Sequence, residues 1–192
     1  MERRNNMDAI ELLTTRCSNG KLTEPAPDPE SLRLAYAAAA RAPDHQSLRP
    51  LRVFTLRGPA RERLGELMAE SLRRKQPAAS SDELAKTRAK ALRAPLILVV
   101  AAVLEPHPKV PFVEQQLSAG AAAYALLLSL QARGFSAIWR TGDSAYDPEV
   151  KAAFSLRPQD ALIGFIYAGT AKQPAPDFSR PVPESFVHEW GQ

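Results

Sequence analysis

Three short polar stretches contain residue types that could bind a charged small molecule, and each adjoins an apolar segment. Residues 16–18 (Arg-Cys-Ser) combine a forked guanidinium with a hydroxyl, a pair suited to a phosphate dianion. Residues 41–47 (RAPDHQS) form a polar loop framed by prolines, and binding residues often gather in such loops. Residues 139–141 (Trp-Arg-Thr) stand at the carboxyl end of a predicted strand. The candidate binding residues are Arg16, Cys17, Ser18, Arg41, His45, Ser47, Trp139, Arg140 and Thr141.

Each stretch on its own also has a purely structural explanation. An arginine near a helix end, such as Arg16, often complements the helix dipole at the surface. The 41–47 loop could be a proline-framed turn capped by Asp44. Residues 139–141 could be a core tryptophan followed by a solvated arginine. No single stretch is therefore specific for a function.

Several common catalytic patterns are absent from the sequence. It lacks the Walker A pattern and the GxGxxG, GxSxG, HExxH and CxxC patterns. His45, His107 and His188 are far apart in the chain, so the sequence indicates no metal site. The single cysteine, Cys17, excludes an intrachain disulfide and fits a reducing compartment. What remains is the polar density of the three stretches described above.

Length and charge favour an ordinary globular protein. The 192 residues, 45% of them hydrophobic, predict a single domain over 1–192. The net charge of +4 is spread along the chain, and the run at 73–75 is typical of a solvated helix face rather than a nucleic-acid site. No apolar signal region follows the N-terminus, so we expect a cytoplasmic protein with residues 1–6 as a loose extension.

The predicted elements alternate between helices and apolar strands. Helices are expected over 8–15, 30–41, 59–75, 81–91, 114–133 and 148–155, and strands over 51–56, 96–103, 135–140 and 162–168. Residues 23–28 are predicted to form an extended linker, and residues 171–192 a proline-rich extended tail. The fold class is therefore α+β.

The predicted helix over 114–133 is apolar on all sides. Its unbroken apolar run, 119–128, is too short for a bilayer span, which needs about 20 residues. A helix that is apolar all round must be covered all round. We therefore expect a buried central helix shared with a partner subunit, and no membrane association.

Taken together and in this order, the polar and apolar stretches resemble the nitroreductase family of flavin enzymes, in particular its small single-domain NAD(P)H nitroreductase branch. The resemblance covers about residues 7–170. The matching stretches are Asp8-Ala-Ile-Glu-Leu-Leu, Arg16-Cys-Ser, Arg41-Ala-Pro-Asp-His-Gln-Ser, Arg93-Ala-Pro-Leu-Ile, Lys109-Val-Pro, Glu114-Gln-Gln, Ser118-Ala-Gly, Gly134-Phe, Ile138-Trp-Arg-Thr-Gly and Gly164-Phe-Ile-Tyr-Ala-Gly-Thr.

The resemblance implies a homodimer with a mostly antiparallel sheet flanked by helices, and FMN bound at the subunit interface. It assigns the three polar stretches to flavin binding. It implies that hydride passes from NAD(P)H to flavin N5 and then to a nitroaromatic, a quinone or another small acceptor, in a ping-pong cycle. No catalytic side chain is then required, and water or His45 could supply a proton.

Some positions differ from the family pattern. Members commonly carry a basic residue where Cys17 and Gly20 stand, and Gln-Pro-Trp where residues 49–51 read Arg-Pro-Leu. Two alternatives therefore stay open beside the oxidoreductase. One is a flavin-sequestering dimer with little turnover, and the other is a colourless dimeric interaction protein.

Overall fold

The computed structural model describes residues 8–176 and 179–191. Its helices are α1 (Ala9–Thr15), α2 (Pro29–Ala39), α3 (Pro59–Lys75), α4 (Ser81–Ala89), α5 (Phe112–Ala132) and α6 (Pro148–Ala153). Its strands are β1 (Leu22–Thr23), β2 (Leu51–Leu56), β3 (Leu96–Ala102), β4 (Ser136–Arg140) and β5 (Ala161–Ala171). Single 3₁₀ turns are η1 (His45–Ser47), η2 (Lys90–Leu92), η3 (Asp143–Ala145) and η4 (Pro183–Ser185). The bounds of β2 and α3 coincide with those expected from the sequence.

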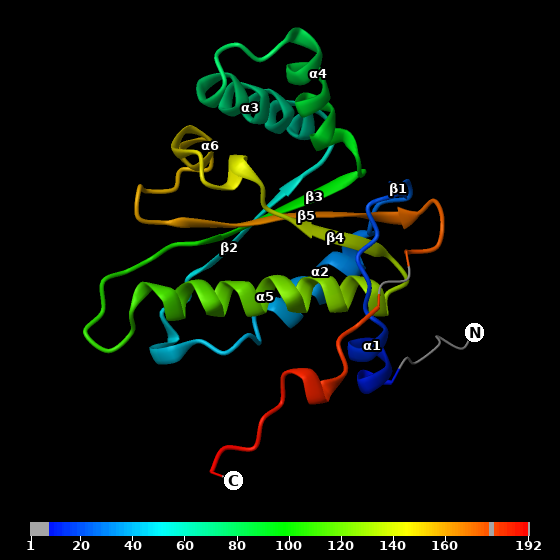
Figure 1. The fold of residues 1–192 in the computed structure, drawn as a ribbon, viewed down its shortest axis with the longest axis vertical. Helices are drawn as coiled ribbons and strands as arrows, with labels where there is room; N and C mark the ends of the chain where they lie inside the picture. The colour runs from blue at the N-terminus through cyan, green and yellow to red at the C-terminus, as the bar shows by residue number, and fades with distance from the viewer. Residues whose placement is uncertain (1–7, 177–178, 192) are drawn as a thin grey trace.

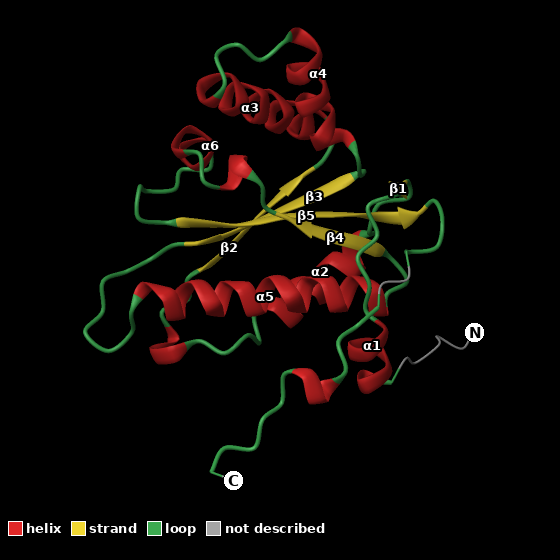
Figure 2. Cartoon of the chain, viewed as in Figure 1, coloured by secondary structure: helices red, strands yellow, loops and turns green. Residues whose placement is uncertain are grey.

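The strands form one five-stranded sheet in which every pairing is antiparallel. Strand β5 is its centre, because β1, β3 and β4 all pair with it, and β2 extends the sheet beyond β3. All seven residues of β3 are buried. Its unbroken apolar sequence follows from this position, since helices cover both faces of the sheet (Figure 2). The predicted α+β class and antiparallel sheet are confirmed.

Helices α3, α4 and α6 lie on one side of the sheet, and α2 and α5 lie on the other (Figure 1). The alternation along β3 divides the core accordingly. Ile97 and Val99 pack with residues of α3, whereas Leu98 and Val100 pack with residues of α2 and α5. Apolar packing on both faces fixes the sheet between the helices. The end of β4, where residues 139–141 lie, is therefore positioned by the core.

Strand β1 is the element that sequence reasoning assigned in part to a linker. Its two residues pair with Thr170 and Ala171 at the end of β5. Two residues are too few to display the alternation that identifies a strand. This strand exists because β5 extends to Ala171, three residues beyond its predicted end.

Helix α5 is covered on only one side by its own chain. Ala119, Ala123 and Leu126 are fully buried, but Leu117 is 67% exposed and Val113 is 57% exposed. The helix is thus apolar on a face that no described residue covers. Among the described residues, no helix is both long and apolar enough to cross a membrane.

After β5 the chain first runs beside residues 16–21, and the C-terminal end then extends away from the sheet (Figure 1). It contains one 3₁₀ turn, η4, and its large apolar side chains are exposed: Val182, Phe186, Val187 and Trp190. The proline-rich extended tail expected over 171–192 stays a prediction. The loose extension expected at 1–6 lies outside the described residues.

Candidate functional site

The third polar stretch lies where β4 ends. Strand β4 pairs with β5, which places Trp139 opposite Ile166. The Trp139 indole Nε1 donates a hydrogen bond to the Ile163 carbonyl oxygen, 3.1 Å away. Gly164 leaves space for this indole, since a Cβ there would overlap Nε1 and lie 2.8 Å from the Arg140 carbonyl oxygen. The half-buried Trp139 side chain therefore packs directly on the backbone of β5 at Gly164, which has no side chain.

The first polar stretch runs beside β4. The backbone N–H of Asn19 donates to the Ala137 carbonyl oxygen at 3.1 Å, and the buried Asn19 side chain donates to the Gln173 carbonyl oxygen at 2.9 Å. A Cβ on Gly20 would lie 3.2 Å from Nη2 of Arg140. Within the stretch, Arg16 Nη1 lies 3.4 Å from Ser18 Oγ. Asn19 and Gly20, which directly follow the first stretch, thus lie against β4 and Arg140.

A cavity of about 470 Å³ opens at the end of β4. Its wall includes all three residues of the third stretch together with residues of α3, η2 and β5. Among the polar wall residues that the sequence did not assign to a site, Lys90, Arg93 and Tyr167 bring two cations and a phenol. Arg93 lies in a stretch that carried the family resemblance, but nothing in the sequence indicated that it faces residues 139–141. Only the pairing of β4 with β5 and the docking of α3 bring these groups together.

The segment after β4, which forms another wall of the cavity, is tied to α3. Asp147 is buried, lies 2.6 Å from Arg74, and caps α6 by accepting from the backbone N–H of Glu149 and Val150. Burial alone would raise the Asp147 pKa, but the hydrogen bonds from Arg74 and from the helix start outweigh it and lower the pKa. Asp147 therefore stays ionised and holds this wall in place.

The second polar stretch forms η1 and a strained turn. Gln46, Ser47 and Arg49 have φ values of 61°, 54° and 53°, in the left-handed region. Asp44 holds the turn by accepting from the backbone N–H of Leu48 at 3.1 Å and of Arg49 at 2.7 Å. Residues held in such conformations often occur at functional sites.

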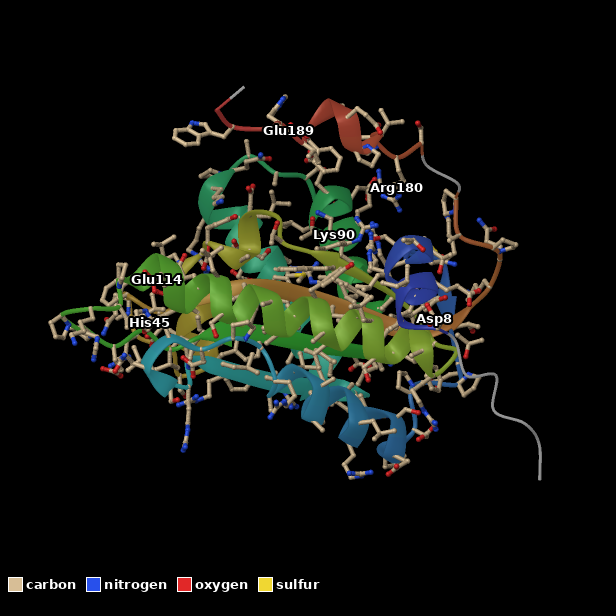
Figure 3. The ribbon with its side chains drawn as sticks, turned by 90° about the horizontal axis from the view of Figure 1, so that it is seen from below. Asp8, His45, Lys90, Glu114, Arg180 and Glu189 are labelled. Atoms are coloured by element: carbon tan, nitrogen blue, oxygen red, sulfur yellow. The ribbon has the colours of Figure 1, made fainter. Side chains whose placement is uncertain are left out.

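His45 and Glu114 link this loop to the start of α5. His45 Nδ1 lies 2.8 Å from a carboxylate oxygen of Glu114. Figure 3 shows this pair at one end of the molecule and Asp8, which caps α1, at the other. The second stretch is thus not brought to the first and third stretches within one chain. No cluster of His, Cys, Asp and Glu among the described residues could hold a metal ion.

The architecture is that of a nitroreductase-like protein. A solved structure of a nitroreductase-like family protein from Bacillus cereus superposes with a TM-score of 0.79 at 21% identity, covering 95% of this chain and 96% of that one. The family model described as "Nitroreductase family" matches residues 13–170. The chain therefore belongs to the nitroreductase family.

Curated relatives are similar over nearly the whole chain. The Escherichia coli K12 protein named "Putative NAD(P)H nitroreductase YdjA" is 42% identical over 94% of this chain and 98% of its own length. A Haemophilus influenzae protein named "Putative NAD(P)H nitroreductase" is 39% identical over 88% of this chain and 91% of its own. A Desulfovibrio desulfuricans structure, described as a "putative nitroreductase in complex with fmn", superposes with a TM-score of 0.73 at 22% identity, covering 94% of this chain and 95% of that one.

Proposed function

We propose that this protein is an FMN-dependent oxidoreductase that uses NAD(P)H to reduce a nitroaromatic, a quinone or another small acceptor. The names of relatives at 39–42% identity support the reaction class. The FMN in the Desulfovibrio complex supports the cofactor. The observation in this chain that carries the proposal is the cation-rich cavity at the end of β4.

The residues present fit FMN. A phosphate dianion needs guanidinium and hydroxyl donors, and Arg16 and Ser18, 3.4 Å apart, supply one of each. Arg140 adds a second guanidinium next to Gly20, two residues after Ser18. Gly20 and Gly164 leave open the space that side chains would otherwise fill next to Arg140 and Trp139. Bound FMN would supply the hydride-accepting and hydride-donating centre, which this chain's side chains lack.

The roles of the side chains are to bind, orient and move protons. Arg140 and neighbouring cations would stabilise negative charge that develops on a reduced ligand in the cavity. The Glu114 carboxylate would hold the Nδ1–H of His45, which leaves Nε2 to exchange a proton with an acceptor. Cys17, Arg41, Ser47 and Thr141 are proposed as further contacts to the cofactor.

A homodimer would complete the site. The His45 loop lies at the far end of α5 from the first polar stretch, so it would have to come from a second copy. The exposed apolar side of α5, with Val113, Leu117 and Tyr124, provides a surface for that copy. Burying such apolar surface is favourable by about 25 cal/mol per Å².

The absorbance spectrum of the purified protein tests the proposed function. We expect two flavin bands that bleach when NADH or NADPH is added without air. Bands that persist would instead favour a flavin-sequestering dimer. An absence of bands after incubation with FMN would contradict flavin binding altogether.

Replacing Arg16 or Arg140 with alanine should weaken FMN retention. Each change removes a charge-assisted hydrogen bond, which contributes about 1.5–3 kcal/mol, so the dissociation constant should rise by roughly 10- to 100-fold. Quenching of flavin fluorescence during titration measures that constant. Arg33→Ala is the control, because Arg33 forms an exposed pair with Glu30 on α2. If both site variants hold FMN as tightly as the parent, the phosphate assignment is wrong.

A further inference from the structure

Lys90 and Arg93 stand on the same side of a single turn that faces the cavity. Lys90 is the first residue of η2, and Arg93 directly follows it. Both side chains line the cavity, as do Arg140 and Tyr167. In a 3₁₀ helix, with 3.0 residues per turn, side chains three positions apart lie above one another. The local geometry therefore directs an ammonium and a guanidinium towards one part of the cavity.

The turn that carries these two cations is anchored. Ala91 within it is fully buried, and Ala94 just after it is 2% exposed. Arg61 of α3 donates through Nη1 to the Ala94 carbonyl oxygen at 2.6 Å. The backbone that bears Lys90 and Arg93 is thus fixed against α3 rather than free in solvent.

Neither cation has a counter-ion in the part of the chain that the structure describes. No carboxylate lies within ion-pair distance of Lys90, Arg93 or Arg140 there. The one acidic residue of the cavity wall, Asp143, lies 3.6 Å from Lys75. Counting the residues that the structure describes, the cavity therefore carries positive charge that no carboxylate neutralises.

Tyr167 adds a neutral donor to this charge. Burial raises the pKa of its phenol, although the nearby charges of Arg93 and Arg140 act in the opposite direction. The phenol consequently stays protonated at neutral pH and can donate a hydrogen bond. A phenol beside two guanidinium groups suits an anionic oxygen ligand better than a neutral one.

The number of cations exceeds what one phosphate requires. In the proposed function, Arg16, Ser18 and Arg140 suffice for the FMN phosphate, which leaves Lys90 and Arg93 without a ligand. We propose that Lys90 and Arg93 bind an anionic group, carboxylate or phosphate, of the second small molecule that enters this cavity. This inference rests on the proposed function, and it specifies the class of substrate. The group could belong to the acceptor or be the 2′-phosphate of NADPH.

Calorimetric binding measured without turnover tests this inference. The oxidised protein, as purified, is titrated in one arm with 4-nitrobenzoate and with neutral 4-nitrobenzamide, and in the other arm with NADP⁺ and NAD⁺. The parent should prefer the anionic member of at least one pair. In the double variant Lys90→Ala/Arg93→Ala, the preferred anionic ligand should bind about tenfold or more weakly. The affinity for the less charged member of the same pair should stay unchanged. The arm that responds identifies which molecule carries the anion.

Three further variants separate charge from folding. Lys86→Ala removes a cation from α4 that does not line the cavity, and it should leave all four affinities unchanged. Lys90→Gln and Arg93→Gln each remove one charge but keep a polar side chain, so each should still lose part of the preference if the double variant does not fold.

Several outcomes would overturn the inference. One is equal binding of charged and neutral ligands by the parent in both arms. Another is loss of the anionic preference in Lys86→Ala as well. A third is loss of FMN from the double variant, which would make these residues flavin ligands. A parent without flavin would contradict the proposed function, but the 4-nitrobenzoate arm on that protein would still decide this inference.

Discussion

Gly164→Ala is expected to displace the Trp139 indole and destabilise the protein. The new Cβ would overlap Trp139 Nε1, and the residue has φ of +151°, which side chains rarely allow. Overpacking in a well-packed interior costs about 1–3 kcal/mol, and the unfavourable φ adds to this. We expect a lower urea midpoint, and a weaker affinity for FMN because the cavity wall at 139–141 would shift.

Gly20→Ala provides a matched comparison for Gly164→Ala. Its Cβ would lie 3.2 Å from the end of the flexible Arg140 side chain, which can move, and not against backbone. The urea midpoint of Gly20→Ala should therefore stay close to that of the parent. Equal urea midpoints for Gly164→Ala and the parent would show that the packing of Trp139 on β5 does not require glycine at position 164.

Asp160→Ala should also lower stability by a large amount. Asp160 is 3% exposed and accepts from the backbone N–H of Leu104 at 2.8 Å and of Arg157 at 2.7 Å. The Arg157 guanidinium also donates to it at 3.0 Å. Leaving a buried N–H unsatisfied costs about 1–3 kcal/mol, and a hydrogen bond to a charged group contributes a further ~1.5–3 kcal/mol. Urea unfolding at pH 7 should thus show a loss of about 3 kcal/mol.

The same carboxylate predicts how stability depends on pH. Burial alone would raise the Asp160 pKa, but the Arg157 side chain and the two backbone donors outweigh it and lower the pKa below its ordinary value of 3.8. Its stabilising contribution is then complete above the unfolded pKa and is lost as pH falls through the folded pKa. Asp160→Asn should flatten the fall in urea midpoint between about pH 5 and pH 2. If the urea midpoint of Asp160→Asn falls with decreasing pH as it does in the parent, other carboxylates cause that fall.

Most of the elements could be predicted because their signals are local. Strand β2 and helix α3 have the predicted bounds, since an alternating pattern defines one and a proline start with charged amphipathic turns defines the other. Strand β3 ends one residue earlier than predicted, and α5 begins two residues earlier. The family resemblance, drawn from ordered short stretches, is confirmed by the match over 13–170.

The site was predictable only in part. Residues 139–141 line the cavity as their position at a strand end suggested, and Asn19 and Gly20 hold the first stretch against β4. Lys90 lies in no matching stretch, and the stretches that contain Arg93 and Tyr167 gave no sign that these side chains line the cavity. The roles of the nine candidate residues, the single domain, the homodimer and the cytoplasmic location stay predictions.

The sequence by itself determined the α+β class, most of the elements and the family, because apolar periodicity, prolines and short motifs act over a few neighbouring residues. Only the tertiary structure decided which charges share a cavity, because residues 90, 93, 140 and 167 meet through strand pairing and helix docking across long separations. It also decided that the His45 loop lies apart from the other two stretches. That separation depends on the length of α5, which spans about 30 Å between its ends.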